Sequence, residues 1–333
     1  MLYLHAIGHF HPENVVTNAF LESLGIDTND AWITERVGIK SRHTVLPLDY
    51  IRETRNRDPR MAIEAATMSN AQTGAAAGRK ALERARLTVR DIGMVLSGSC
   101  SPDECIPAEA NRVAEALGVD AVALDVASAC SSFASQLYFL EAMRPEKLPD
   151  FIMLVNPENS TRVVDYRDRS SCVLWGDCST AAIVSPRVPG PWKVTETYLK
   201  GDPSGADKVK VPRFGHFTQQ GAEVQKFGIK RASESLDFLR AAYLKQPGRS
   251  ASDLSFIGHQ ANLRMLEAVV RRCEVPEGRH FYNVDRRGNV GAAGAPSVFS
   301  EHWDDPALGD AVALSVVGSG LTWAGILFER ARG

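Results

Sequence analysis

One stretch in the first half of the chain, residues 121–143, limits the possible folds more than any other. The apolar run 121–124 has the length of a strand, and residues 134–143 read as a helix with few charges. Between them lies a turn of small residues that carries Cys130. This order predicts a strand, a tight turn and a buried helix, with Cys130 at the N-terminus of the helix.

Cys130 would be activated in such a place. The unpaired backbone N–H groups and the positive dipole end of a helix N-terminus favour an anion, so the pKa of a thiol falls there. A buried structural cysteine fits the same pattern. The stretch alone therefore leaves both interpretations open.

Composition excludes several classes of protein. The 333 residues carry a formal net charge of -2, which gives no electrostatic argument for nucleic acid or a membrane surface. No apolar run approaches the roughly 18–20 residues of a membrane span, and the first residues lack the features of a signal peptide. We therefore expect a cytoplasmic protein that binds neither membrane nor nucleic acid.

The cysteines point away from a metal or a disulfide framework. None of the six forms a C-x-x-C pair, so we expect no zinc site, and scattered cysteines in a large cytoplasmic chain usually stay reduced.

Strands and helices alternate along the chain, which predicts an α/β layered fold. We expect a loop at residues 45–60. The expected strands are 91–96, 121–124, 148–155, 181–184, 254–258, 311–317 and 324–328, and the expected helices include 62–85, 107–117, 224–244 and 260–272.

A weak internal duplication divides the chain. Asp91 and Asp253 open similar segments 162 residues apart, although chance could produce this match. Prolines crowd residues 186–191, the best candidate for an internal boundary. We therefore predict an N-terminal half, 1–186, and a C-terminal half, 187–333.

Three further segments stand out beside Cys130. They contain His259 before a helix, Asn289 in a glycine- and alanine-rich turn, and Gly318 and Gly320 between two strands. Taken singly, the histidine could satisfy helix-terminal groups and the others could simply form turns. All four segments should, however, gather at the carboxyl ends of strands, where α/β proteins bind ligands.

The segments V-A-S-A-C around Cys130, G-H-Q-A-N-L-R around His259 and G-N at Asn289 resemble the β-ketoacyl-acyl-carrier-protein synthase III family of the thiolase superfamily. Trp32 and Arg36 in the early W-I-x-x-R-x-G-I segment match as well. The resemblance implies a thiolase-like five-layer αβαβα fold of two similar halves and a homodimer. It implies no cofactor, with phosphopantetheine thioesters of coenzyme A or acyl carrier protein as substrates.

The resemblance also implies a role for each site residue. Cys130 would take an acyl group from a thioester, and the backbone N–H groups of Cys130 and Gly320 would form the oxyanion hole. His259 and Asn289 would donate hydrogen bonds to an enolate derived from a malonyl or β-ketoacyl carrier-protein thioester. A Claisen condensation would follow, in polyketide-type secondary metabolism or in fatty-acid initiation.

Substrate delivery is implied in the same way. Trp32 would stack on the adenine of coenzyme A, and Arg36 and Arg169 would hold the adenine and phosphate end, although Trp32 could instead be a core residue. A basic cluster is a candidate docking face for an acidic carrier protein or, alternatively, an ordinary solvated helix face. Its members are Lys226, Arg264, Arg271 and Arg272.

Two departures from the housekeeping enzymes bear on the acyl-binding region, namely Ile106 and a longer segment from Val45 to Ala75. Ile106 stands near the acyl pocket where those enzymes usually carry phenylalanine, which makes an unusual acyl donor credible. Relatives that condense acyl chains head to head have a glutamate at this place, and here only Glu104 is close.

A rival interpretation is an enzyme that transfers an acyl group to an oxygen or nitrogen nucleophile. Such relatives tend to replace the asparagine with aspartate, so Asn289 argues against it and nearby Asp285 keeps it open.

Overall fold

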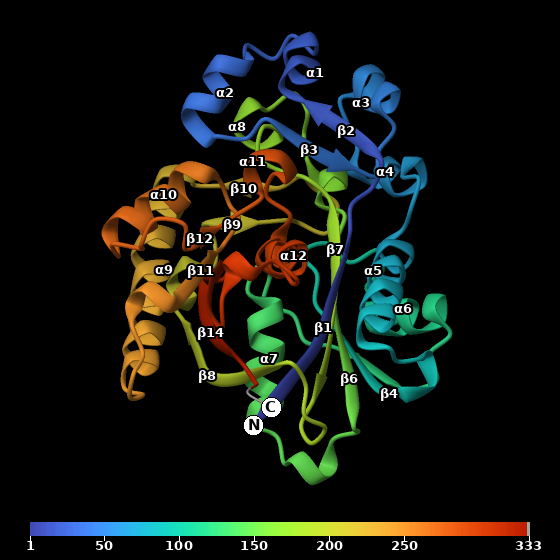
Figure 1. The fold of residues 1–333 in the computed structure, drawn as a ribbon. Helices are drawn as coiled ribbons and strands as arrows, with labels where there is room; N and C mark the ends of the chain where they lie inside the picture. Colours follow the sequence, from blue (N-terminus) through green and yellow to red (C-terminus); the bar gives the residue numbers. More distant parts are fainter. Residues whose placement is uncertain (332–333) are drawn as a thin grey trace.

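A computed structural model describes residues 1–331 and contains one large mixed sheet with helices on both faces (Figure 1). The sheet has ten strands in the order β12-β11-β13-β14-β8-β1-β7-β6-β4-β5. Its strands are β1 (Leu2–Phe10), β4 (Ile92–Ser97), β5 (Val122–Asp125), β6 (Phe151–Glu158), β7 (Cys178–Ser185), β8 (Trp192–Gly201), β11 (Leu254–Gly258), β12 (His280–Phe281), β13 (Ala311–Gly318) and β14 (Thr322–Arg330).

The helices and the short strands outside the large sheet come from both halves of the chain. The helices are α1 (Asn18–Ser23), α2 (Asp30–Val37), α3 (Leu48–Thr54), α4 (Pro59–Ala65), α5 (Asn70–Ala85), α6 (Glu109–Leu117), α7 (Ser132–Ala142), α8 (Arg169–Cys172), α9 (Gly221–Leu244), α10 (Leu263–Arg272), α11 (Val284–Arg287) and α12 (Gly294–Glu301). The strands are β2 (Asn14–Thr17), β3 (Ser41–Thr44), β9 (Val209–Lys210) and β10 (Thr218–Gln219).

The strand order reveals the duplication. The order β1-β7-β6-β4-β5 repeats as β8-β14-β13-β11-β12, with the same chain order and the same pattern of antiparallel and parallel neighbours. Asp91 and Asp253 each end a 3₁₀ turn that leads into β4 and β11, respectively. The two similar halves expected from the sequence are therefore present. We propose that the boundary between the halves lies between β7 and β8, in residues 186–191. The first half then ends at residue 186 and the second begins at residue 187.

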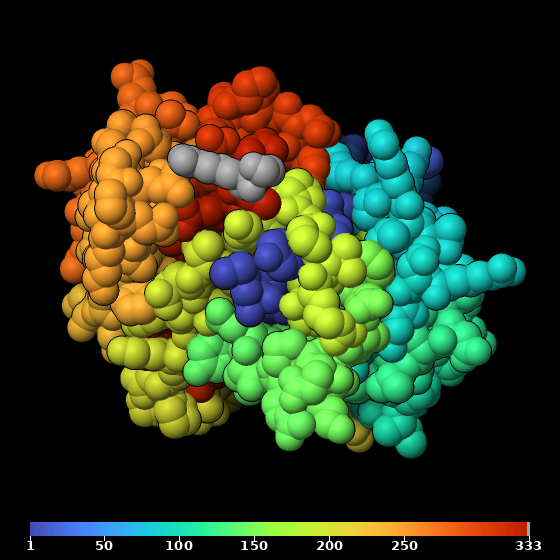
Figure 2. All heavy atoms as spheres, turned by 60° about the horizontal axis from the view of Figure 1, so that its bottom comes forward, coloured from blue at the N-terminus to red at the C-terminus, as the bar shows by residue number. Residues whose placement is uncertain are grey.

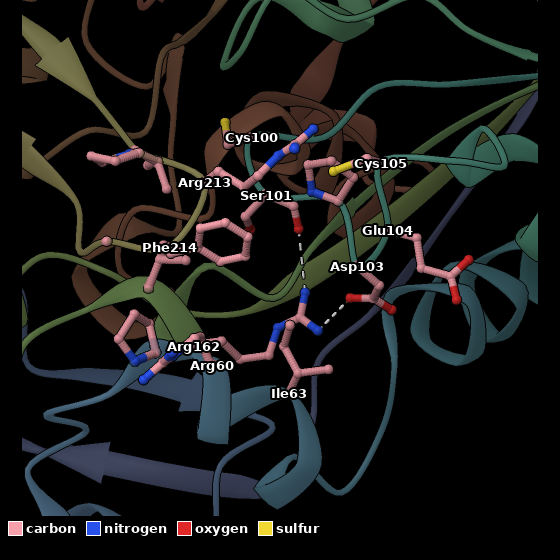
Figure 3. A pocket seen from close by; sticks show the side chains of 16 residues that line it. Arg60, Ile63, Cys100, Ser101, Asp103, Glu104, Cys105, Arg162, Arg213 and Phe214 are labelled. Atoms are coloured by element: carbon pink, nitrogen blue, oxygen red, sulfur yellow. Dashed lines mark hydrogen bonds and ion pairs between the residues drawn. The ribbon is translucent and has the colours of Figure 1, made fainter.

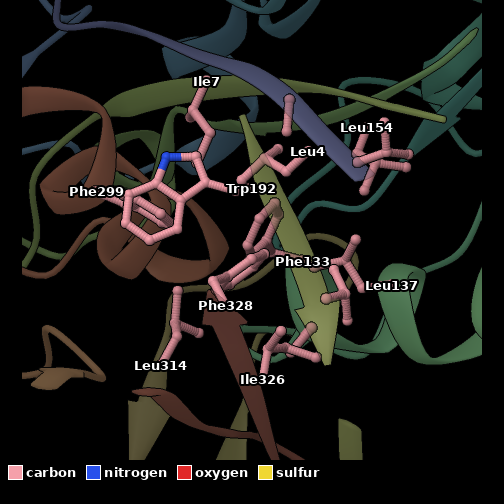
Figure 4. Packing of buried hydrophobic residues seen from close by; sticks show 14 of the residues in the cluster. Leu4, Ile7, Phe133, Leu137, Leu154, Trp192, Phe299, Leu314, Ile326 and Phe328 are labelled. Atoms are coloured by element: carbon pink, nitrogen blue, oxygen red, sulfur yellow. The ribbon is translucent and has the colours of Figure 1, made fainter. Parts of the chain in front are cut away.

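Five layers result from this repetition. Helices α7 and α12 lie in the middle and contact strands of both halves, α5 and α6 cover one outer face, and α9 and α10 cover the other (Figure 1). The thiolase-like αβαβα fold is thus confirmed. Figure 4 shows the centre of the core, where Phe133 and Leu137 of α7, Phe299 of α12 and Trp192 of β8 pack together.

The chain enters this sheet from one end of the molecule. Figure 2 looks onto that end, where the N-terminal residues, in blue, lie at the centre of the face. From there β1 runs through the middle of the sheet, paired with β7 along its length. Its far end, at His9 and Phe10, therefore reaches the other side of the molecule.

The predicted helix over 62–85 is wrong, because two helices occupy the region. Helix α4 ends at Ala65 and α5 begins after Ser69. The hydroxyl of Ser69 accepts from the N–H of Gln72 at 3.2 Å, and the Gln72 side chain accepts from the N–H of Ser69 at 2.9 Å. This capping box starts a new helix despite the continuous alanine-rich composition. The region 45–60, for which we predict a loop that can include a helical turn, contains the short helix α3.

Candidate active site

Cys130 lies on a sharp turn between β5 and α7, as predicted. Ala129, just before it, has φ of +50°, in the left-handed region that L-residues rarely adopt. Ser131 follows as the N-cap of α7. The strained residue and the helix start together project the thiol from the turn beside the unpaired N–H groups of the helix.

A hydroxyl network fixes this turn against the loop between β13 and β14. The Ser131 hydroxyl lies 2.6 Å from that of Thr322, and a Cβ on Gly318 would come within 2.6 Å of the Ser128 carbonyl oxygen. The backbone of β13 thus approaches the turn most closely at Gly318, and the oxyanion-hole role of Gly320 stays a prediction. Gly320 has open space where a Cβ would stand, and its φ of +120° is what favours glycine there.

His259 and Asn289 join Cys130 on the wall of one narrow cavity of about 70 Å³. His259 follows β11, Asn289 follows α11, and each is 7% exposed. Among the described residues, the buried Nδ1 of His259 has no hydrogen-bond partner. The structure therefore brings together three residues from widely separated parts of the sequence.

The surroundings of Asn289 orient its amide. Its backbone N–H donates to Leu174 at 2.8 Å, and its carbonyl accepts from Gly176 at 2.9 Å. Its side-chain Oδ1 accepts from the N–H of Gly291 at 3.1 Å. With the oxygen so engaged, the Nδ2 donors remain for a ligand in the cavity. Asn289 can thus donate hydrogen bonds to an oxyanion without titrating.

Cys100, which our sequence interpretation did not assign to the site, lies beside the nucleophile. The two sulfur atoms of Cys100 and Cys130 are 3.9 Å apart. The thiol of Cys100, which hydrogen-bonds to Cys130, and the imidazole of His259 hold the pKa of Cys130 well below the ordinary value, against the opposing effect of burial. Cys100 follows β4 as Cys130 follows β5, and this shared sheet edge is the signal that could have identified it.

A buried carboxyl group lies under this pair of thiols. Glu158, at the end of β6, accepts from the backbone N–H of Cys100 at 3.1 Å and of Ala292 at 3.0 Å. Burial and the charge of Cys130 raise its pKa to about 8. Glu158 is therefore mostly protonated near neutral pH and adds no full negative charge beside the thiolate.

Replacing Cys100 by alanine is expected to raise the pKa of Cys130, because the largest stabilising hydrogen bond to its thiolate is lost. The pH dependence of Cys130 alkylation by iodoacetamide, followed by peptide mass, should shift to higher pH. Cys105→Ala is the matched control, since Cys105 is exposed and should leave the profile unchanged. An unshifted profile in Cys100→Ala would show that the neighbouring thiol does not tune the nucleophile.

A larger cavity of about 620 Å³ is lined, among others, by Cys100, Ser101, Arg60, Arg213 and Phe214 (Figure 3). Its wall contains the ion pair between Arg162, almost fully buried, and Asp103. This cavity provides room next to the nucleophile that the narrow cavity lacks.

Trp32, Arg36 and Arg169 come together as predicted, although they derive from α2 and α8. The guanidinium of Arg36 lies 4.8 Å and that of Arg169 4.9 Å from the centre of the half-buried Trp32 ring. Arg169 also pairs with Asp27 at 2.6 Å. The result is a cationic surface with an aromatic ring at its centre, which suits an adenine nucleotide.

The basic cluster lies on α9 and α10, but its members differ. Lys226, Arg271 and Arg272 are exposed. Arg264 instead donates to the carbonyl oxygens of Thr34 at 2.8 Å and Glu35 at 3.0 Å, near the C-terminal end of α2. Its side chain therefore has a structural role between α10 and α2.

Ile106, Glu104 and Asp285, which bear on the alternative substrates and reactions, do not line the narrow cavity. Ile106 is 86% exposed and lines neither cavity of the described chain. Glu104 lines the larger cavity and pairs with Arg112 at 2.9 Å. Asp285, on α11, lines neither cavity of residues 1–331. The asparagine, not the nearby aspartate, thus shares the narrow cavity with Cys130.

Comparison with known proteins identifies the family of the chain. Residues 124–203 match the family model "3-Oxoacyl-[acyl-carrier-protein (ACP)] synthase III" and residues 244–330 match the model of its C-terminal part. The chain is 33% identical to the β-ketoacyl-[acyl-carrier-protein] synthase III of Roseiflexus sp. (strain RS-1), over 94% of this chain and 93% of that protein. It is 31% identical to the enzyme of the same name from Sulfurovum sp. (strain NBC37-1), over 97% and 94%.

Solved structures show the same likeness. The 3-oxoacyl-[acyl-carrier-protein] synthase III from Aquifex aeolicus VF5 superposes with a TM-score of 0.85 at 26% identity, covering 99% of this chain and 100% of that one. The priming β-ketosynthase of the R1128 polyketide pathway gives 0.80 at 25% identity, covering 99% and 96%. In the described part of the chain, no helix has the length and apolar character that crossing a membrane requires.

Proposed function

Because the chain belongs to the β-ketoacyl-[acyl-carrier-protein] synthase III family, whose members are condensing enzymes that start fatty-acid or polyketide chains, we propose that Cys130, His259 and Asn289 carry out its reaction. The observation that supports this most is that the three residues line one cavity. The Oδ1 atom of Asn289 accepts from the N–H of Gly291, which leaves its Nδ2 donors for a substrate. The family makes it an acyl-transferring enzyme, and the assignment of roles to residues is ours.

In the first half-reaction, the Cys130 thiolate attacks the carbonyl carbon of an acyl thioester. A tetrahedral oxyanion forms, and the N–H groups of Cys130 and Gly320 stabilise it by hydrogen bonds. The thiolate of coenzyme A, or of a carrier-bound pantetheine, then leaves and takes a proton. The acyl group remains on Cys130 as a new thioester, which divides the reaction into two steps.

In the second half-reaction, a malonyl thioester loses carbon dioxide and becomes an enolate. His259 and Asn289 donate hydrogen bonds to the enolate oxygen, which lowers the barrier because charge develops there. The nucleophilic carbon attacks the acyl carbonyl on Cys130. Collapse of the second tetrahedral oxyanion releases the Cys130 thiolate and a β-ketoacyl thioester. No cofactor is needed, because both substrates already carry activated thioesters.

The experiment that tests this proposal identifies the product. The enzyme is incubated with acyl-coenzyme A of graded chain length and malonyl carrier protein, and products are separated by chromatography with mass detection. We expect carbon dioxide release and a β-ketoacyl carrier protein. Transfer of the acyl group to an alcohol or amine, with no new carbon–carbon bond, would instead support the acyltransferase alternative.

Delivery of the substrates follows from the exposed features of the site. We assign the adenine of coenzyme A to Trp32, flanked by Arg36 and Arg169, since both guanidinium groups already lie near its ring. We assign the docking of an acidic carrier protein to Lys226, Arg271 and Arg272, which are exposed. Arg264 contributes less, because its guanidinium is held by hydrogen bonds to α2. The six free cysteines support a reducing, cytoplasmic setting.

We expect a homodimer, and the exposed apolar residues support one. Strand β5 ends the sheet, so one of its edges is open, and Val122 and Leu124 on it are 61% and 40% exposed. Phe139 of α7 and Ile106 are exposed as well. An edge strand with apolar side chains favours pairing with a second copy. Contact with a second copy could also cover Ile106, which is 86% exposed.

Sedimentation should therefore give a mass near twice the 36.3 kDa of one chain at micromolar concentration. Val122→Lys should shift the protein to the monomer, because a two-fold axis brings like charges together. Met61→Lys, at an exposed apolar residue outside β5, is the matched control. A wild-type mass near that of one chain would refute the dimer.

A further inference from the structure

Three residues, two of them far from the third in the sequence, gather where β1 ends beside β7 and α12. Ligating atoms of His9, His11 and Glu301 all lie within 4.8 Å of one another. His9 and His11 are two positions apart on extended chain and therefore point to the same side. Glu301 is the last residue of α12. None of the three lines the cavity around Cys130 in the described chain.

A hydrogen bond fixes the tautomer of His11, and the contacts of His9 fit the same one. Nδ1 of His11 lies 3.3 Å from the carbonyl oxygen of Asp177, which can only accept, so this nitrogen carries the proton. Nδ1 of His9 lies 2.9 Å from the hydroxyl of Ser300, which also accepts from Arg84 at 3.1 Å and lies 2.8 Å from the carbonyl oxygen of Ile7. When the hydroxyl proton goes to that carbonyl, both imidazoles carry their proton on Nδ1 and have their lone pair on Nε2, as in metal-binding histidines.

The Nε2 atom of His11 faces a carboxylate oxygen and a sulfur atom. Its Nε2 lies 3.9 Å from Oε1 of Glu301 and 3.8 Å from the sulfur of Cys178, at the start of β7. A lone pair that faces a carboxylate is repelled unless a proton or a cation lies between them. Burial and the charges of Arg287 and the neighbouring histidines lower the pKa of His11 well below its usual value, and burial lowers the pKa of His9 to about 4. The thiol proton of Cys178 is the hydrogen-bond donor that is available to His11 Nε2, and a bound metal ion would take its place.

We propose that His9, His11 and Glu301 bind a divalent transition metal, with Zn²⁺ as the best fit and Cys178 as the fourth ligand. Two imidazoles, a carboxylate and a thiolate are ligands that zinc accepts in a tetrahedral site. Ligand bonds of about 2.0–2.3 Å require the donor atoms to move closer together. Cys178 must move most, because its sulfur lies outside the group of His9, His11 and Glu301 although it is 3.8 Å from His11. His43, whose ring lies 5.2 Å from that of His11, is excluded, because its Nε2 accepts from Arg287 at 2.7 Å.

Charge sets the conditions for binding. Arg286 and Arg287 pair with Glu301 at 2.9 Å and 3.2 Å, and they both orient this carboxylate and oppose a cation. Cys178 is fully buried, and burial raises the pKa of its thiol. Metal binding would deprotonate it, and the Cys178 thiolate would then offset part of the zinc charge beside Arg286 and Arg287.

The proposed site is structural and joins three elements. It would link the end of β1, the start of β7 and the end of α12, the helix that follows the Asn289 turn (Figure 1). With four protein ligands it leaves no open position for substrate. A ligand that binds only the folded chain stabilises it, so zinc should raise the melting temperature.

The test measures metal on the full-length protein. The protein is stripped with a chelator, reloaded with Zn²⁺, freed of unbound metal by gel filtration and analysed by mass spectrometry of the element. Wild type and Cys130→Ala should each hold about one zinc per chain and should melt at a higher temperature than the stripped forms. These two proteins leave the cluster unchanged and so decide the question even if ligand variants fail to fold.

Ligand variants then locate the metal. His11→Ala and Glu301→Gln should lose at least nine-tenths of the zinc, and His5→Ala, a histidine of β1 outside the cluster, should keep it. With Co²⁺ in place of Zn²⁺, a thiolate charge-transfer band should appear and be absent in Cys178→Ser. A wild type without zinc, or zinc that is lost in Cys130→Ala and retained in His11→Ala, would overturn the proposal. A missing cobalt–thiolate band would overturn the role of Cys178.

Discussion

Cys130→Ala is expected to abolish acyl loading, because the variant lacks the only atom that we assign to covalent capture of the acyl group. The wild-type chain should gain the mass of one acyl group when incubated with acyl-coenzyme A, and the variant should gain none. Intact-protein mass spectrometry measures both. Condensation activity should fall with loading, since no acyl-enzyme forms for the second half-reaction.

The remaining cysteines provide the controls for this result. Single alanine variants at these positions should still load one acyl group, and at Cys100 only the pH dependence should change. The control positions are Cys100, Cys105, Cys172, Cys178 and Cys273. Acylation of Cys130→Ala at the wild-type rate would show that the nucleophile has been wrongly assigned.

Asn289→Ala is expected to separate the two half-reactions. Loading needs the thiolate and the backbone N–H groups and should proceed at close to the wild-type rate. Condensation needs the amide donor at the enolate, and loss of one such donor typically costs about 10²–10³ in rate. The acyl-enzyme should therefore accumulate, as seen by intact mass, while little β-keto product appears by chromatography.

Two further variants sharpen this test. Asn289→Asp can keep the oxygen that accepts from Gly291 but lacks the donor, so it should load and fail to condense in the same way. His259→Ala should impair condensation at least as much and should also slow loading, because the imidazole helps to lower the pKa of Cys130. Normal product formation by either Asn289 variant would remove this residue from the enolate site.

Local patterns were sufficient to predict much of the fold. The strand, small-residue turn and nearly uncharged helix around Cys130 correspond to β5, the turn with positive φ at Ala129, and α7. The equivalent aspartates before β4 and β11 pointed to the repeat that the strand order confirms. Such features are encoded by periodicity and turn chemistry over short distances, which is why they can be read directly. The error at residues 62–85 was also local, since the capping box at Ser69 and Gln72 was overlooked.

Contacts between residues that lie far apart in the sequence could not be predicted in this way. Cysteine spacing, on which the prediction of no zinc site depends, carries no information about two histidines at the end of β1 that meet a glutamate late in the chain only in the fold. In the same way, nothing near Cys130 in the sequence shows that Cys100 and Glu158 lie beside it.

The sequence by itself thus determined the elements, their repetition and the family to which the motifs belong. Only the tertiary structure decided which side chains face one another: the thiol next to the nucleophile, the asparagine on the same cavity wall, Arg264 held by α2, and the imidazoles facing Glu301. The physical reason is that a hydrophobic period fixes the inward face of each element independently, whereas the meeting of two polar groups depends on how separate elements pack.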